Sequence, residues 1–330
     1  MTPVYTTTFV HPWHAEWCER TIQIDVRDGR AAALRRLAAS ARPAILHGAT
    51  GFGRGYVDLL AAGALARRGH SVLVADATWE PGSRVLDRVS RASSPAAYDA
   101  APRTGRRLAK WAIGRLDRSN VHYGVLSRAE LETFPRLWGV DRARVHFTPF
   151  CATVARPSLP AYEPGGSGVL ASGNSLRDYR ALLAAADGVN ATVTIASSLS
   201  LPESGPDNLR IGFLAPQAHE ALVRRSAVIV VPLLADTERS AGQQTYLNAM
   251  ARGKPVVVTE APGVTDYIRD GETGLVVPNE PGALSEAING LLADPERATR
   301  LGRAARAEVE AKFTVGAYVT RLLEVADRAL

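Results

Sequence analysis

Lysine is nearly absent from this chain of 330 residues, because 36 of its 39 basic residues are arginine and only Lys110, Lys254 and Lys312 are lysine. With the high alanine content, this skew indicates biased codon usage more than a nucleic-acid surface, and we expect no nucleic-acid partner. The formal net charge is +6. Arginine suits anionic ligands such as phosphates, since its guanidinium fork matches their oxygens.

Cysteine is also scarce. Cys18 and Cys151 lie far apart in the sequence, which favours free thiols in a reducing compartment. No run of 18 apolar residues occurs, so we expect no spanning helix. The N-terminal stretch MTPVYTTTFVHPWH lacks a basic segment followed by an apolar one, so no signal peptide is expected. These absences predict a cytoplasmic protein.

Strand-like and helix-like segments alternate along the whole chain. Such alternation predicts parallel sheets with helices on both faces, and therefore an α/β fold. The segments rich in β-branched residues that predict strands are 4–9, 21–26, 43–47, 71–75, 121–126, 144–149, 168–172, 191–196, 209–213, 227–231, 255–259 and 274–277. The predicted helices are 30–41, 55–69, 105–117, 127–138, 176–186, 216–225, 243–252, 263–269, 282–293 and 296–311.

The alternation is interrupted once, by ARPSLPAYEPGGSG at 155–168. A stretch rich in Pro, Gly and Ser predicts an interdomain linker. We therefore expect two Rossmann-like domains, 1–154 and 168–312, joined by a linker at 155–167.

A glycine-rich turn in the first half, GATGFGRGY, resembles the phosphate loop of the extended short-chain dehydrogenases, with Asp76 as the ribose-binding acid. Gly48 and Gly51 fit that spacing, but the third glycine would be residue 54, which is Arg54. No lysine follows a tyrosine by four residues, as those enzymes require. A NAD(P)-dependent dehydrogenase or epimerase using Gly48–Gly55 is kept as an alternative, beside a plain turn that holds an anionic group.

The second half carries a stronger signal, because several motifs occur in order over 228–278. They are VPL, then LNAMARGKPVV, TEAPGVTDYI and DGETGLVVP, preceded by ASGNSLRDYRALLAAA. Together they resemble the nucleotide-sugar domain of GT-B glycosyltransferases, specifically the retaining family 4 (glycosyl transferases group 1). The resemblance covers most of 119–330. It implies two Rossmann-like domains whose parallel sheets face across an interdomain cleft, with the acceptor side in 1–154, the donor side in 168–312, and a helix at 313–330 that crosses back.

The same resemblance implies a donor site at the strand ends of the second domain. Gly173 and Asn174 follow the first strand, where the loop meets the donor diphosphate, and Arg177 would neutralise that diphosphate. The nucleoside base would pack near Phe213 and Leu214.

The sequence departs from the family at its Glu-x7-Glu signature, where Ser240 and Asn248 stand. In the family the first Glu contacts the hydroxyls of the donor sugar and the second holds the ribose. Serine and asparagine can still hydrogen-bond a hydroxyl, but without charge. Two interpretations stay open: an active transferase with an unusual donor, and a non-catalytic GT-B partner subunit.

The segment between those two positions begins a helix. Gly242 precedes Gln243 and Gln244, so free backbone N–H groups and the helix dipole would point at the diphosphate. Arg239 could add a charge-assisted contact.

Candidates on the acceptor side lie at strand ends of the first domain. His11 and His14 lie in HPWHAEW, where the tryptophans could stack on an acceptor, and His47 and Asp76 end two strands. An H-x-x-H pair is weak evidence for metal. The resemblance implies no metal, no cofactor beyond the nucleotide sugar, and no obvious nucleophile.

One further segment, 103–118, is basic and amphipathic, so it could rest on an anionic membrane, although an ordinary packed surface helix is the alternative. The sequence as a whole predicts a glycosyltransferase of natural-product or cell-surface glycan biosynthesis, with a nucleotide-sugar donor and an acceptor that it does not identify.

Overall fold

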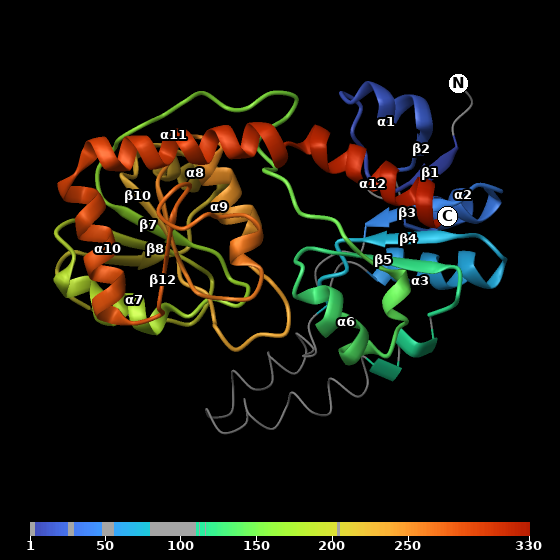
Figure 1. Cartoon of the computed structure of the whole chain (residues 1–330), viewed down its shortest axis with the longest axis horizontal. Helices are drawn as coiled ribbons and strands as arrows, with labels where there is room; N and C mark the ends of the chain where they lie inside the picture. The colour runs from blue at the N-terminus through green and yellow to red at the C-terminus, as the bar shows by residue number, and fades with distance from the viewer. Residues whose placement is uncertain are drawn as a thin grey trace. The chain divides into compact units, whose positions relative to one another are not determined.

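The computed structural model describes residues 4–25, 30–47, 56–79, 110–111, 113–115, 117–202 and 205–330. The chain divides into two compact units, the first made of Met1–Pro149 with Tyr318–Leu330 and the second of Phe150–Ala317 (Figure 1). The last helix, α12 (Val315–Ala329), therefore begins in the second unit and continues in the first.

The first unit is built on a six-stranded parallel sheet with the strand order β2-β1-β3-β4-β5-β6. The strands are β1 (Tyr5–Thr7), β2 (Thr21–Gln23), β3 (Ala44–His47), β4 (Val72–Ala75), β5 (Val121–Val125) and β6 (Val145–Phe147). The helices in its described part are α1 (Ala15–Arg20), α2 (Arg30–Ala39), α3 (Tyr56–Arg67) and α6 (Glu130–Trp138), with the 3₁₀ turn η2 (Arg142–Arg144).

The second unit holds another six-stranded parallel sheet, with the order β12-β11-β10-β7-β8-β9. Its strands are β7 (Val169–Ser172), β8 (Val193–Ala196), β9 (Leu209–Gly212), β10 (Val228–Val231), β11 (Val256–Thr259) and β12 (Leu275–Val277). The described helices are α7 (Tyr179–Ala185), α8 (Pro216–Arg225), α9 (Gln243–Met250), α10 (Pro281–Ala293) and α11 (Pro295–Lys312), with the 3₁₀ turns η3 (Ala186–Gly188) and η4 (Val264–Asp266).

Strand β7 shows why this sheet is covered on both faces. Its side chains point alternately to opposite faces, so Leu170 joins a core cluster with α8, α9 and α11, whereas Val169 and Ala171 join another with α7 and α10 (Figure 1). Each fully buried side chain of the size of Val169 or Leu170 stabilises the fold by about 1.5–3 kcal/mol. Strands β10 and β11 are also covered by helices on both faces, so all of their side chains are buried. This explains their nearly continuous apolar sequences, VIVV and VVVT.

The strand order reverses at β7. The chain runs outward from β7 to β8 and β9, then returns to place β10 on the other side of β7. Connections on the two sides therefore leave toward opposite faces, and a crevice opens at the carboxyl ends of the strands between them. The first sheet reverses in the same way at β1, which lies between β2 and β3.

The α/β architecture predicted from the sequence is confirmed, including every predicted strand. Helix α1 was not predicted, because six residues are too few to show a period; it forms because His14 Nδ1 accepts the Trp17 N–H at 3.2 Å and Trp17 is buried. The helix expected at 263–269 is wrong, since only η4 forms after Gly263. The one expected at 105–117 lies mostly outside the described residues.

Two glycines in neighbouring helices differ sharply in their surroundings. A Cβ on Gly302 in α11 would lie 2.0 Å from the backbone oxygen of Gly253, whereas on Gly290 in α10 it would meet only the end of Arg297 at 3.8 Å. The glycine at 302 is thus what lets α11 pack directly on that backbone.

We predict that Gly302→Ala lowers the free energy of unfolding by about 1–3 kcal/mol, because backbone atoms must move apart. The matched change Gly290→Ala should be neutral or stabilising by up to about 1 kcal/mol, since alanine favours helix. Urea denaturation of both variants checks this, and equal midpoints would contradict it.

Two histidines pair across β5 and β6. His122 Nδ1 and His146 Nε2 lie 3.0 Å apart, with the rings stacked at 5.3 Å between centroids. Burial, and then the neighbouring His122, Arg328 and Arg142, lowers the pKa of His146 to about 4. The pair is therefore neutral at pH 7 in the folded state.

We predict that the neutral pair makes the first unit sensitive to acid. The histidine pKa in an unfolded chain is about 6.5, so the contribution of neutral His146 is complete above that pH and is lost as the pH falls toward 4. Denaturation midpoints measured between pH 7.5 and pH 5 should fall less steeply for His146→Gln than for the native chain. Parallel curves would refute this.

Candidate functional site

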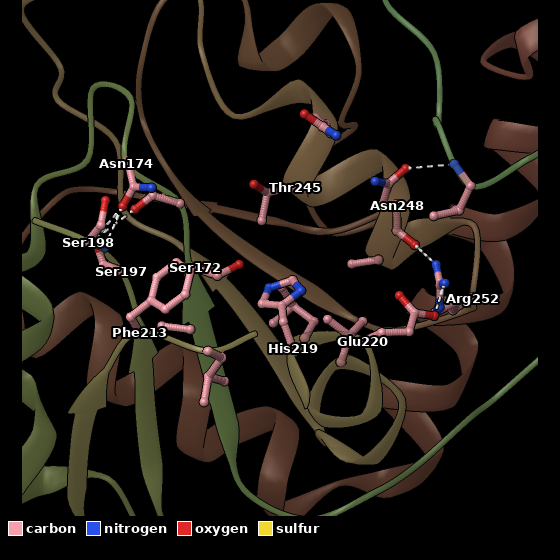
Figure 2. Close-up of a pocket in the computed structure, with 18 residues that line it drawn as sticks. Ser172, Asn174, Ser197, Ser198, Phe213, His219, Glu220, Thr245, Asn248 and Arg252 are labelled. Carbon is pink, nitrogen blue, oxygen red and sulfur yellow. Dashed lines mark hydrogen bonds and ion pairs between the residues drawn. The ribbon is translucent and has the colours of Figure 1, made fainter. Parts of the chain in front are cut away.

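A cavity of about 340 Å³ opens in the second unit at the carboxyl ends of its strands (Figure 2). One wall comes from the residues that follow β7, β8 and β9, namely Gly173–Asn174, Ser197–Ser198 and Phe213–Leu214. The facing wall comes from α8 and α9. The cavity is lined by Ser172 of β7 and Ile229 of β10, and so lies at the reversal of strand order, where α/β sheets bind ligands.

The loop after β7 is held by the loop after β8. Asn174 Oδ1 accepts from Ser197 Oγ and from the Ser198 N–H, both at 2.8 Å. This fixes the side-chain amide of Asn174 at the cavity wall, and no described residue accepts from its Nδ2. That N–H group is available to a ligand oxygen.

Helix α9 contributes one face to the cavity. Gln244, Thr245, Asn248 and Ala249 recur at helical spacing, and Arg252 follows one turn later. The amide of Asn248 binds protein: Oδ1 accepts from Thr153 Oγ1 and the Val154 N–H at 3.3 Å, and Nδ2 donates to Thr153 Oγ1 at 3.0 Å.

The start of α9 has unsatisfied donors. Gly242 precedes it at φ 90°, and a Cβ there would crowd Leu233, Val231 and Tyr246 at 3.2–3.3 Å. No side chain caps the helix, so the first backbone N–H groups have no partner within it. Gln243 is 5% exposed, and its Nε2 has no hydrogen-bond acceptor among the described residues. Such donors favour a bound anion.

Arg177 lies directly behind the loop after β7. It donates to Ser172 O at 3.1 Å, to Ser175 O at 2.8 Å and to Thr245 Oγ1 at 2.9 Å. Gly173, at φ 113°, leaves room for it, since a Cβ there would lie 2.6 Å from Arg177 Nη2. Burial lowers the pKa of Arg177, and no described carboxylate forms an ion pair with it.

A second guanidinium lies close by. Arg239 donates to Ser175 Oγ at 2.7 Å and to Ser240 O at 3.0 Å. Burial lowers the pKa of Arg239 to about 10, so this side chain still carries its charge at neutral pH. Both arginines therefore reach Ser175, and together they make this end of the site positive.

The other end of the cavity combines three ionisable side chains (Figure 2). Arg252 donates to Asn248 O at 3.1 Å and forms an ion pair with Glu220 Oε1. His219 precedes Glu220 on α8, and its pKa is lowered by burial and by Arg252, against the opposing effect of Glu220.

The structure brings about half of the predicted donor-site residues to the cavity wall, namely Gly173, Asn174, Phe213, Leu214, Gln244 and Asn248. The others surround the start of α9 or lie behind the wall, namely Arg177, Arg239, Ser240, Gly242 and Gln243. Sequence reasoning missed Thr245, Ser197, His219, Glu220 and Arg252. Helical spacing from Asn248 could have found Thr245 and Arg252.

The predicted acceptor-side residues lie in the first unit. His14 caps α1. His11 is 9% exposed and stacks on Phe9. Asp76 is 3% exposed at φ 52°, and accepts a hydrogen bond from Tyr318 Oη at 2.5 Å.

Three other predictions for the first unit concern residues that lie wholly or mostly outside the described ranges of the chain. The side chain of His47 and the loop Gly48–Gly55 lie outside them, as does most of 103–118. Among the residues that are described, no three His, Cys, Asp or Glu side chains gather as metal ligands would. No helix in those ranges combines the length and apolar character needed to cross a bilayer.

Comparison with solved structures defines the class of fold. Sucrose-phosphate synthase from Thermosynechococcus elongatus superposes with a TM-score of 0.59 at 21% identity, over 93% of this chain and 82% of that one. HepE of Anabaena, in complex with UDP and glucose, superposes with a TM-score of 0.61 at 15% identity, over 91% and 81%. The chain has the GT-B fold.

Sequence comparison locates the family signal in the second unit, where residues 169–294 match glycosyl transferases group 1. A D-inositol 3-phosphate glycosyltransferase of Nocardia farcinica is 31% identical over 145 residues, 43% of this chain and 30% of that protein. A GDP-mannose-dependent alpha-(1-6)-phosphatidylinositol monomannoside mannosyltransferase of Mycolicibacterium smegmatis is 44% identical over 62 residues, 18% and 16% of the two chains. The matches span less than a third of these relatives' own length.

We predict that Tyr318→Phe lowers the free energy of unfolding by about 0.5–1.5 kcal/mol, the usual net contribution of a hydrogen bond, because buried Asp76 loses this donor. Thermal unfolding measures the change. Tyr162→Phe removes a hydroxyl with no described partner and should leave the midpoint unchanged; if the two variants behave alike, the contact contributes nothing.

Proposed function

We propose that the chain is a glycosyltransferase that moves a sugar from a nucleoside-diphosphate sugar to an acceptor hydroxyl. The observation that carries this is the cavity at the β7/β10 reversal, with Arg177 and the uncapped start of α9 behind its wall, inside the region that matches glycosyl transferases group 1. HepE, which shares the fold, is described in complex with UDP and glucose.

In the proposed complex the diphosphate occupies the start of α9. The helix N-terminus, Gln243 Nε2 and the two arginines supply donors and positive charge there. The bond from the sugar's anomeric carbon to the phosphate oxygen breaks while a bond to the acceptor oxygen forms, and the proton of the acceptor hydroxyl passes to the leaving diphosphate. Charge that develops on the leaving diphosphate is then stabilised by fixed donors. These groups serve a metal-independent transfer, and we propose that the anomeric configuration is retained.

The nucleoside end lies against the loops after β8 and β9. Phe213 is 75% exposed beside the cavity and offers an aromatic face to a base. The acceptor is assigned to the first unit, by the resemblance alone. The described part of 103–118 exposes Trp111, with Arg115 stacked over it at 5.0 Å, and contact with a membrane stays a prediction.

One observation favours the alternative of a non-catalytic subunit. Ser240 is 1% exposed, and Asn248, although it lines the cavity, uses its amide to bind Thr153 and Val154, so neither offers a ligand the free carboxylate of the family's two glutamates. An NAD(P) enzyme is less well supported, because the carboxylate of Asp76 is buried against Tyr318.

A thermal-shift panel with UDP, GDP, dTDP, ADP, NAD and NADP tests the proposal. Binding at a hundredfold excess over Kd stabilises by about 2.7 kcal/mol, so one nucleoside diphosphate should raise the Tm. Arg177→Met should weaken its binding by about 1.5–3 kcal/mol, whereas Arg180→Met, at a side chain 84% exposed on α7, should not.

Stabilisation by NAD or NADP alone would contradict the transferase and support the dehydrogenase. Binding of a nucleoside diphosphate without release of sugar from any donor would support the silent subunit.

A further inference from the structure

The cavity has a charge asymmetry that the proposed diphosphate site does not explain. Of the described side chains that line it, Glu220 alone carries a carboxylate. The positive groups gather at the start of α9, but Asn248 lies five residues further on, roughly 7.5 Å along the axis, and Arg252 lies one turn beyond. Glu220 is held at that far end by Arg252.

The ion pair with Arg252 holds the partly exposed carboxylate of Glu220 in one orientation. The side chain of Arg252 is 5% exposed and is anchored to Asn248 O at 3.1 Å, while its other bond goes to Glu220 Oε1. Glu220 itself is 45% exposed, and no described residue donates to its Oε2. One oxygen is therefore used for orientation, and the other is left as an acceptor on a side chain that lines the cavity.

Charge decides what such an oxygen can bind. A phosphate would be repelled, and the charge of Arg252 is already neutralised by the ion pair. A hydroxyl can donate to a carboxylate in a charge-assisted hydrogen bond, which is about twice as strong as a neutral one. In a nucleoside diphosphate, the group between the base and the phosphates is the ribose, which carries two adjacent hydroxyls.

We propose that Glu220 binds the ribose hydroxyls of the nucleotide, and that Arg252 positions it for this. The assignment rests on the proposed function. The acceptor oxygen of Asn248 already receives hydrogen bonds from Thr153 and Val154, so the assignment goes to the carboxylate of Glu220. The site thereby selects ribonucleotides over deoxyribonucleotides through a side chain of α8, from across the cavity.

Isothermal titration with UDP, GDP and ADP, and with their 2′,3′-dideoxy forms, tests this on the full chain. The native protein should bind one ribonucleotide at least about tenfold more tightly than its dideoxy form. Glu220→Gln can still accept a hydrogen bond from Arg252, but the ratio of the two affinities should fall to near one. The affinity for the ribonucleotide should drop about ten- to hundredfold, and the affinity for the dideoxy form should not change. Glu296→Gln, a side chain 91% exposed on α11, is the control and should change neither affinity.

Any other result would overturn the assignment of Glu220 to the ribose. Equal weakening of both nucleotides in Glu220→Gln would mean that Glu220 only supports the fold, and an unchanged ratio would also overturn the assignment. A parallel titration of Glu220→Gln with UDP-glucose completes the test: normal binding of UDP with weaker binding of UDP-glucose would move the contact to the transferred sugar and overturn the ribose role. If the native chain binds none of the six nucleotides, the proposed function fails. If it binds them without preferring the ribonucleotide, only the ribose assignment fails.

Discussion

The pairing of β10 with β7 is the constraint on which the site depends. The chain leaves β7 toward β8 and β9, so when β10 returns to the other side of β7, the two following connections must cover opposite faces. Between them the strand ends remain open. Ser172 ends β7 at this opening, and the cavity extends from it to the face of α9. Hydrophobic burial on both faces of the sheet holds the opening in place.

The electrostatic polarity of the cavity follows from where each element ends. Helix α9 points its uncapped start toward the loop after β7, and Arg177 and Arg239 lie around that point. Arg177 is held by carbonyl and hydroxyl oxygens, so its charge is costly to bury, and an anion at the helix start would offset that cost. The opposite end carries Glu220, already paired with Arg252. A ligand with phosphates at one end and hydroxyls further along fits this polarity.

The departure from the family signature gains a structural account. Ser240 is buried, and Asn248 ties α9 to Thr153 and Val154 in the segment that follows the first unit. An asparagine can both donate and accept, which a glutamate carboxylate cannot, so this position joins two segments 95 residues apart. A carboxylate is nonetheless present in the cavity, because Glu220 enters it from α8.

The sequence alone determined the strands, the longer helices and the α/β class, since these depend on the period of buried residues within short segments. It also predicted a donor site that includes Gly173, Asn174 and Asn248, three residues that line the cavity. It missed α1, and it did not find Glu220, which meets Arg252 across 32 residues. Nor could it show that Arg177 lies behind Gly173, or that Asp76 is bound by Tyr318 at a separation of 242 residues. Those contacts were decided only by the tertiary structure, because they depend on how separate elements pack, whereas periodicity reports only which face of one element is buried.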